Sequence, residues 1–174
     1  DETSAFVPSS QCIACHAQLT AATGEEISIG FDWRATMMAN SARDPYWHAA
    51  VRREVLDHPA AQAVIEDTCS TCHMPMARFD AAAAGGQGRV FANIAPAAPQ
   101  HELAFDGVSC TVCHQISAQN LGSHASFDGG FAIDRRSGGR VAFRPHDLDT
   151  GRQALMRSAA TFNPSKSTHI QQSE

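Results

Sequence analysis

The segment Asp67-Thr-Cys-Ser-Thr-Cys-His73 ends in the pentapeptide Cys-x-x-Cys-His, which occurs three times in this chain of 174 residues. The other two copies are Cys12-Ile-Ala-Cys15-His16 and Cys110-Thr-Val-Cys113-His114. The three copies together use all six cysteines of the chain. One copy should arise by chance in about one chain in a hundred of this composition, so three copies indicate a common chemical purpose.

The spacing of these residues is that of covalent haem attachment. Two thiols on one short helical turn bond to the vinyl groups of a haem, and the imidazole of the next residue binds the iron. The sequence therefore predicts three c-type haems (heme c). The predicted attachment residues are Cys12, Cys15, Cys69, Cys72, Cys110 and Cys113, and the predicted proximal iron ligands are His16, His73 and His114. In chain order, the segments that begin at Cys12, Cys69 and Cys110 are called the first, second and third motifs.

Two other uses of paired cysteines explain the pattern less well. Zinc sites combine two Cys-x-x-Cys pairs, and three pairs do not divide evenly into Cys₄ sites. A zinc site also does not explain why a histidine follows the second cysteine of every motif. Disulfides are disfavoured because each pair is too closely spaced in sequence to join distant parts of the fold.

The ligand on the distal side of each iron distinguishes an electron carrier from an enzyme. A second protein ligand prevents a substrate from binding the iron, whereas a vacant position permits a reaction there. The sequence offers more candidates than three irons need. On flexible segments we expect His101, nine residues before Cys110, and His124, ten residues after His114. Further candidates are Met37, His146 and Met156, whereas His48 and His58 are expected to have surface or propionate-contacting roles.

Three longer stretches resemble a group of bacterial multihaem cytochromes c. They are Trp33-Arg-Ala-Thr-Met-Met-Ala-Asn-Ser-Ala-Arg-Asp-Pro45, Cys72-His-Met-Pro-Met-Ala77 and Asp106-Gly-Val-Ser-Cys-Thr-Val-Cys-His-Gln-Ile116. This group is similar to the cytochrome c554 family, in which a segment of the type Trp-x-x-Ser-x-His-Ala provides a distal histidine. Met38 stands at that histidine's place here. The resemblance makes Met38 a candidate distal ligand of a high-potential haem, because a thioether favours ferrous iron.

The end of the chain resembles the same group. Its members often read His-x-x-x-Ser-Glu directly before another Cys-x-x-Cys-His, and this chain runs from His169 to Ser-Glu174. The resemblance implies that His169 is a distal ligand. It also suggests that residues 1–174, a single multihaem domain with two lobes, form the N-terminal part of a longer chain.

Composition limits the partners of the protein. The net charge of −5 and the scattered arginines argue against nucleic acid and anionic lipid, which need clustered basic side chains. We interpret many of the arginines as partners of haem propionates. No stretch is long and apolar enough to span a bilayer, and the first residues look like a processed mature protein. Because c-type haem is attached outside the cytoplasm, we expect a periplasmic or extracellular protein.

The predicted fold is mainly α with long loops and little β, and the haems form its core. We expect a helical segment over about Trp33 to Asn40. Asp44 and Pro45 should start an amphipathic helix whose apolar face is Trp47, Val51 and Val55. After Pro59, a second helix should lead into Cys69. The Ala-, Gly- and Pro-rich stretch 81–100 predicts a long loop, and alternating apolar residues around 137–139 predict one hairpin between Phe127 and Phe143.

These observations favour an electron-transfer protein over a multihaem redox enzyme or a haem sensor. The enzyme and the sensor both need an open iron, and the chain carries enough candidate ligands to close every site. The expected partners are redox proteins or other haem domains, with this chain as a candidate subunit of a larger assembly.

Overall fold

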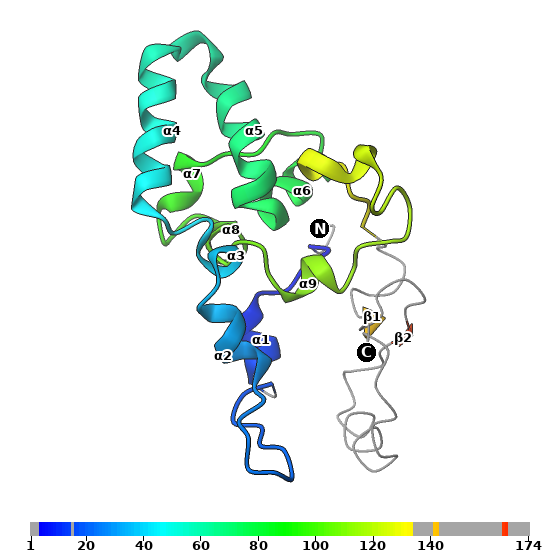
Figure 1. The fold of residues 1–174 in the computed structure, drawn as a ribbon. Helices are drawn as coiled ribbons and strands as arrows, with labels where there is room; N and C mark the ends of the chain where they lie inside the picture. Colours follow the sequence, from blue (N-terminus) through cyan, green and yellow to red (C-terminus); the bar gives the residue numbers. More distant parts are fainter. Residues whose placement is uncertain (1–3, 15, 134–140, 143–164, 167–174) are drawn as a thin grey trace. The chain divides into compact units, whose positions relative to one another are not determined.

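The structure is a computed structural model, and it describes residues 4–14, 16–133, 141–142 and 165–166. The chain divides into two compact units, residues 1–112 and residues 113–174. Each unit is described by itself. The described part of the chain is mainly helical, as predicted (Figure 1). Among the described residues no helix is long and apolar enough to cross a membrane.

Short helices make up most of the first unit. They are α1 (Ser9–Ile13), α2 (Ile29–Arg34), α3 (Met37–Asn40), α4 (Pro45–Asp57), η1 (Pro59–Ala61), α5 (Gln62–His73), α6 (Pro75–Ala83), α7 (Phe91–Ile94) and α8 (His101–Phe105), and α9 (Cys110–Cys113) follows at the boundary between the units. The single helical segment expected over 33–40 is wrong in one respect. Two helices meet there, because the Thr36 hydroxyl caps the second by accepting a hydrogen bond from Ala39 N at 3.3 Å.

The longest helix, α4, begins where its sequence predicts. The Asp44 carboxylate accepts a hydrogen bond from Tyr46 N at 2.8 Å, and Pro45 takes the first helical position. The predicted face of Trp47, Val51 and Val55 is buried. The second predicted helix is confirmed as α5, which lies beside α4 and contains the second motif at its C-terminal end (Figure 1).

The core of the first unit lies between these two helices and the segments that follow. Its buried members are Ala42, Trp47, Val51, Val55, Met74, Ala77, Val90 and Ala104. Partly buried apolar side chains pack around it, and the Cys69 side chain is one of them. The second motif is therefore attached directly to the core.

The long loop expected over 81–100 is only partly correct. Helix α6 extends to Ala83 and α7 interrupts the stretch. The segment is fixed by two neighbouring carboxylates of α5. Glu66, which is 3% exposed, accepts hydrogen bonds from Val90 N at 2.7 Å and Phe91 N at 3.1 Å. Asp67 accepts from Gly88 N at 2.7 Å.

The described part of the second unit contains η2 (His124–Gly129), β1 (Val141–Ala142) and β2 (Ser165–Lys166). The described pairings differ from the predicted hairpin, whose turn lies outside the described residues. Strand β1 pairs in parallel with β2, and Ile133 forms an isolated antiparallel bridge with Ile116. Alternation of apolar residues predicted extended backbone but could not select the partner strand.

The ionisation of Asp67 links the stability of this fold to pH. Its carboxylate accepts hydrogen bonds from Arg78 at 3.3 and 3.2 Å as well as from Gly88 N. The Arg78 hydrogen bond, helped by Gly88 N–H and opposed by burial, lowers the pKa of Asp67 below its ordinary value of 3.8. Folding is therefore stabilised above that ordinary value, and this contribution is lost as the pH falls through the folded-state pKa.

We predict that Asp67→Asn lowers the free energy of unfolding by about 1 kcal/mol near pH 7, because a charge-assisted pair becomes neutral while staying partly exposed. The difference from the native chain should vanish between about pH 5 and pH 2. Denaturant unfolding followed by circular dichroism measures both. The control is Asp57→Asn, which removes an exposed pair with Arg53 and should have a much smaller effect. Equal effects of the two substitutions would contradict this role of Asp67.

Candidate haem-attachment sites

The second motif lies on the last turn and a half of α5. Cys69, Cys72 and His73 are spaced i, i+3 and i+4, so the helix presents them on one side. Cys69 is half-buried against the core and Cys72 is exposed. Burial raises the pKa of the Cys69 thiol, and the nearby Cys72, Glu54 and Glu66 add to this effect. The helix thus holds one thiol firmly and offers the other to the surface.

The His73 ring is held by two groups outside its own helix. Its Nδ1 lies 2.7 Å from the carbonyl oxygen of Ser41, and the Ser41 hydroxyl donates back to the His73 carbonyl at 3.1 Å. The Trp47 indole is parallel to the imidazole, with the ring centroids 4.2 Å apart and the planes 5° from parallel. A carbonyl accepts but never donates, so Nδ1 carries the proton and Nε2 keeps its lone pair for a metal.

The first and third motifs are also helical turns where they are described. His16 N donates to Cys12 O at 3.0 Å, an i to i−4 bond that continues the turn begun by α1. The third motif begins with α9. His16 and His114 are both half-buried, and Cys15 lies outside the described residues.

A buried carboxylate holds the first motif beside the start of the third. Asp106, 5% exposed, accepts hydrogen bonds from Ser9 N at 2.7 Å and from Ser9 Oγ at 2.6 Å. Thr111 Oγ1 donates to Val7 O at 2.9 Å. Each bond joins the chain just before or within α1 to the chain around α9.

The first cysteines of these two motifs are in contact. A hydrogen bond between the side chains of Cys12 and Cys110 lowers the pKa of the Cys110 thiol to about 7, although burial acts in the opposite direction. Two attachment points that are far apart in the sequence are therefore neighbours in the fold.

Among the candidate distal histidines, His101 has its ring held by two neighbouring groups. Its Nδ1 lies 2.9 Å from Asn93 O, and its ring stacks on Phe105 with centroids 4.5 Å apart. As in His73, Nδ1 donates to the carbonyl, and Nε2 is the nitrogen that a neutral ring offers to a metal. His48 has the opposite arrangement, because its Nε2 lies 2.8 Å from Ala42 O.

The methionines of the described part of the chain separate into exposed and buried side chains. Met37 and Met38 are exposed, whereas Met74 and Met76 are fully buried in the protein itself. The backbone of Met38 is fixed beside the third motif, because Met38 O accepts from Val108 N at 3.0 Å. The residue is 51% exposed and does not belong to the described core.

The other predicted ligands are less defined. In the second unit, His124 is exposed beside Phe127, with ring centroids 5.4 Å apart. His58 is exposed at the end of α4. His146, Met156 and His169 lie outside the described residues.

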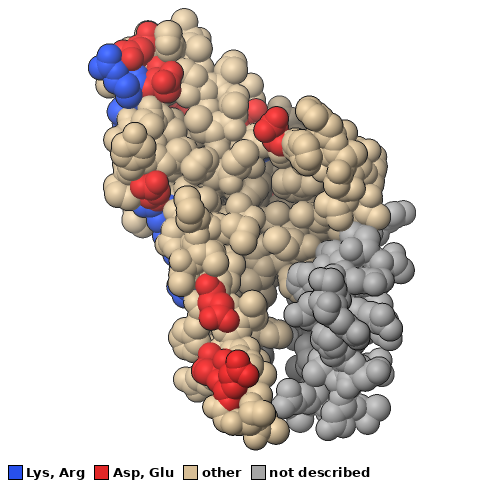
Figure 2. Space-filling view, viewed as in Figure 1, with Lys and Arg blue, Asp and Glu red and all other residues tan. Residues whose placement is uncertain are grey.

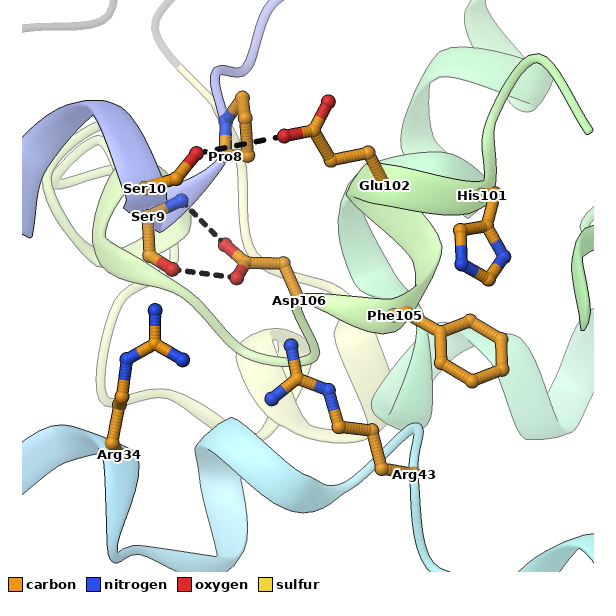
Figure 3. A pocket seen from close by; sticks show the side chains of 9 residues that line it. All are labelled: Pro8, Ser9, Ser10, Arg34, Arg43, His101, Glu102, Phe105 and Asp106. Atoms are coloured by element: carbon orange, nitrogen blue, oxygen red, sulfur yellow. Dashed lines mark hydrogen bonds between the residues drawn. The ribbon is translucent and has the colours of Figure 1, made fainter. Parts of the chain in front are cut away.

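A pocket of about 200 Å³ lies between α1, α2 and α8 of the first unit (Figure 3). Its lining residues are Pro8, Ser9, Ser10, Arg34, Arg43, His101, Glu102, Phe105 and Asp106. Figure 3 shows the guanidinium groups of Arg34 and Arg43 extending toward the paired Ser9 and Asp106. Neither arginine forms an ion pair with a described residue. The pocket therefore combines two guanidinium groups and two carboxylates with an imidazole and an aromatic ring.

The described imidazoles fit a haem iron. Among the described residues no three His, Cys, Asp or Glu side chains form a group that could hold a metal ion by themselves. A haem iron takes four ligands from the porphyrin, so one imidazole on each side is sufficient. His73 and His101 each offer an Nε2 of this kind.

Comparison with protein-family models, curated proteins and solved structures gives no match for this chain. The predicted relation to multihaem cytochromes therefore depends on the residues quoted above and on the geometry of the motifs.

Sequence reasoning did not identify several residues that organise these sites. Ser41 and Asn93 act through backbone carbonyls, which leave no trace in residue identity. Trp47 was predicted only as part of an apolar helix face. Asp106 begins the stretch Asp106–Ile116 and directly precedes Gly107. Nothing in the sequence indicated that its carboxylate would contact Ser9.

Gly107 allows the turn before the third motif to approach the turn after α3. It has φ +65°, and a Cβ there would lie 2.5 Å from Met38 O and 2.8 Å from Ser41 Oγ. We predict that Gly107→Ala lowers the free energy of unfolding by about 3 kcal/mol, from strain and overpacking together. Gly24, with φ +88° and nothing within 4 Å, is the matched control. Gly24→Ala should cost about 1 kcal/mol, from strain alone.

Denaturant unfolding of the two alanine variants measures the difference. Similar losses in both would mean that the close approach at Gly107 is not required.

Proposed function

We propose that this protein is an electron carrier that holds three c-type haems on its three Cys-x-x-Cys-His motifs. The observation that carries the proposal is the second motif. Its thiols and imidazole share one side of α5, and His73 keeps Nε2 free because Ser41 O binds Nδ1. When bound, haem supplies a one-electron iron couple. The residues of the chain attach it, orient its ligands and limit access to it.

The contact between Cys12 and Cys110 supports electron carriage rather than isolated cofactors. The Cys12 and Cys110 sulfurs both belong to the first unit, so groups attached at them would begin from neighbouring positions. Transfer between cofactors depends on such proximity, and the protein contributes by fixing their positions.

Exposed apolar side chains that follow the first motif in the sequence support a large apolar ligand. Those in residues 19–38 are Leu19, Ile27, Ile29, Phe31, Met37 and Met38. Large apolar side chains exposed in one stretch of chain are suited to a surface that a ligand covers. We propose that the porphyrins cover part of it, as a predicted haem core requires.

The charges on the first unit fit the propionates and the partners of such a carrier. Arg34 and Arg43 extend into the pocket that His101 lines, and we assign them to propionate carboxylates (Figure 3).

Glu25, Glu26 and Asp32 are exposed, and Figure 2 shows acidic side chains gathered over the part of the first unit that contains α2. We propose redox proteins with basic docking surfaces as partners, outside the cytoplasm.

The test is the visible spectrum of the reduced protein before and after addition of carbon monoxide. We predict c-type bands that carbon monoxide leaves unchanged, because tight distal ligands close the irons. A shift in one haem's share of the spectrum would favour the redox enzyme or the haem sensor, and the absence of c-type bands would overturn the proposal.

A pair of variants tests the distal assignment in the same measurement. His101→Ala should open one iron, so that about a third of the reduced absorbance responds to carbon monoxide if each of three haems contributes equally. His48→Ala is the control, because Ala42 O already occupies its Nε2. An equal response of both variants would remove His101 from the ligand set.

A further inference from the structure

Trp47 and His73 form a parallel stack that joins two helices of the first unit. Trp47 lies on the first turn of α4, and His73 is the last residue of α5. Their ring planes are 5° from parallel, with centroids 4.2 Å apart. An aromatic pair at this distance is stabilised beyond the effect of its buried area alone. The stack is therefore a specific, oriented contact between the two side chains.

The indole is itself held rigidly. Trp47 is 8% exposed and packs in the core with Val51 and Val55. Ser41 O binds the Nδ1 of His73, and the Trp47 indole covers one face of the imidazole. The two contacts together limit rotation of the His73 ring.

We propose that Trp47 is a positioning residue for the second motif, which fixes the plane of the His73 imidazole and favours the oxidised state of the iron bound at Nε2. This inference rests on the proposed function. Trp47 is not assigned as an iron ligand.

The direction of the effect follows from charge. An imidazole bound to ferric iron carries more positive charge than one bound to ferrous iron, and the face of an indole is negative. The stack is thus stronger in the oxidised state. The Ser41 carbonyl acts in the same direction, because a hydrogen bond at Nδ1 makes the ligand more basic. Both groups should lower the midpoint potential of the second haem.

A purely structural role for Trp47 makes a different prediction. If the indole only fills the core, Leu at this position costs stability and leaves the iron's electronic state unchanged. The midpoint potential and the ferric electron paramagnetic resonance spectrum distinguish the two roles, because the spectrum responds to the orientation of axial ligand planes.

The experiment compares Trp47→Leu and Trp47→Phe with the native holoprotein. In Trp47→Leu, the oxidised-to-reduced ratio of one haem at a fixed potential should fall about threefold, which is ~28 mV at 59 mV per tenfold for one electron. The g values of the same haem should change. Trp47→Phe should shift the ratio less, in the same direction, since a phenyl face is less negative. Trp33→Phe is the control, because Trp33 Nε1 bonds Val108 O and not the second motif.

The outcomes separate this inference from the proposed function. A native protein without covalent haem overturns both. Three attached haems with native potentials and g values in Trp47→Leu overturn only the role of Trp47. If Trp47→Leu does not fold, Trp47→Phe decides, and an unchanged potential and spectrum there contradict the inference.

Discussion

The hydrogen bond between His73 Nδ1 and the carbonyl oxygen of Ser41 is the interaction on which the candidate second site depends. It fixes the imidazole tautomer and leaves Nε2 for a metal. It also joins the end of α5 to the turn before α4, so the motif and the apolar core are built from the same segments. Any displacement of α4 would move both the carbonyl and the indole of Trp47 away from the ring.

Buried carboxylates organise the rest of the first unit in a similar way. Glu66 holds the chain around Val90 against α5, and Asp106 holds Ser9 beside the third motif. Each carboxylate accepts backbone N–H groups that short helices leave unpaired, which compensates for its burial. A chain with a small apolar core is thereby shaped around its motifs. The proposed haems would complete that core.

The sequence predicted the elements with strong local signals. Asp44 and Pro45 mark the start of α4, and the spacing of its apolar residues marks the buried face. Helix α7 was missed because the chain at its start is held by Glu66 and Asp67, which are distant in sequence.

The candidate site divides in the same way. The three motifs predicted the attachment residues, which remain a prediction. The carbonyl partners of His73 and His101 could not be predicted, because any residue supplies a carbonyl and only the fold brings it into place. The pairing of Cys12 with Cys110 likewise depends on Ser9 and Asp106, and neither belongs to a motif.

The most direct test of the account is the intact mass of the protein purified from a host that attaches c-type haem, followed by peptide mapping. The account predicts the mass of the polypeptide plus three haem groups, one on each peptide that carries Cys12, Cys69 or Cys110. A polypeptide without added haem, or with its cysteines joined in disulfides or free as thiols under the same conditions, would contradict it.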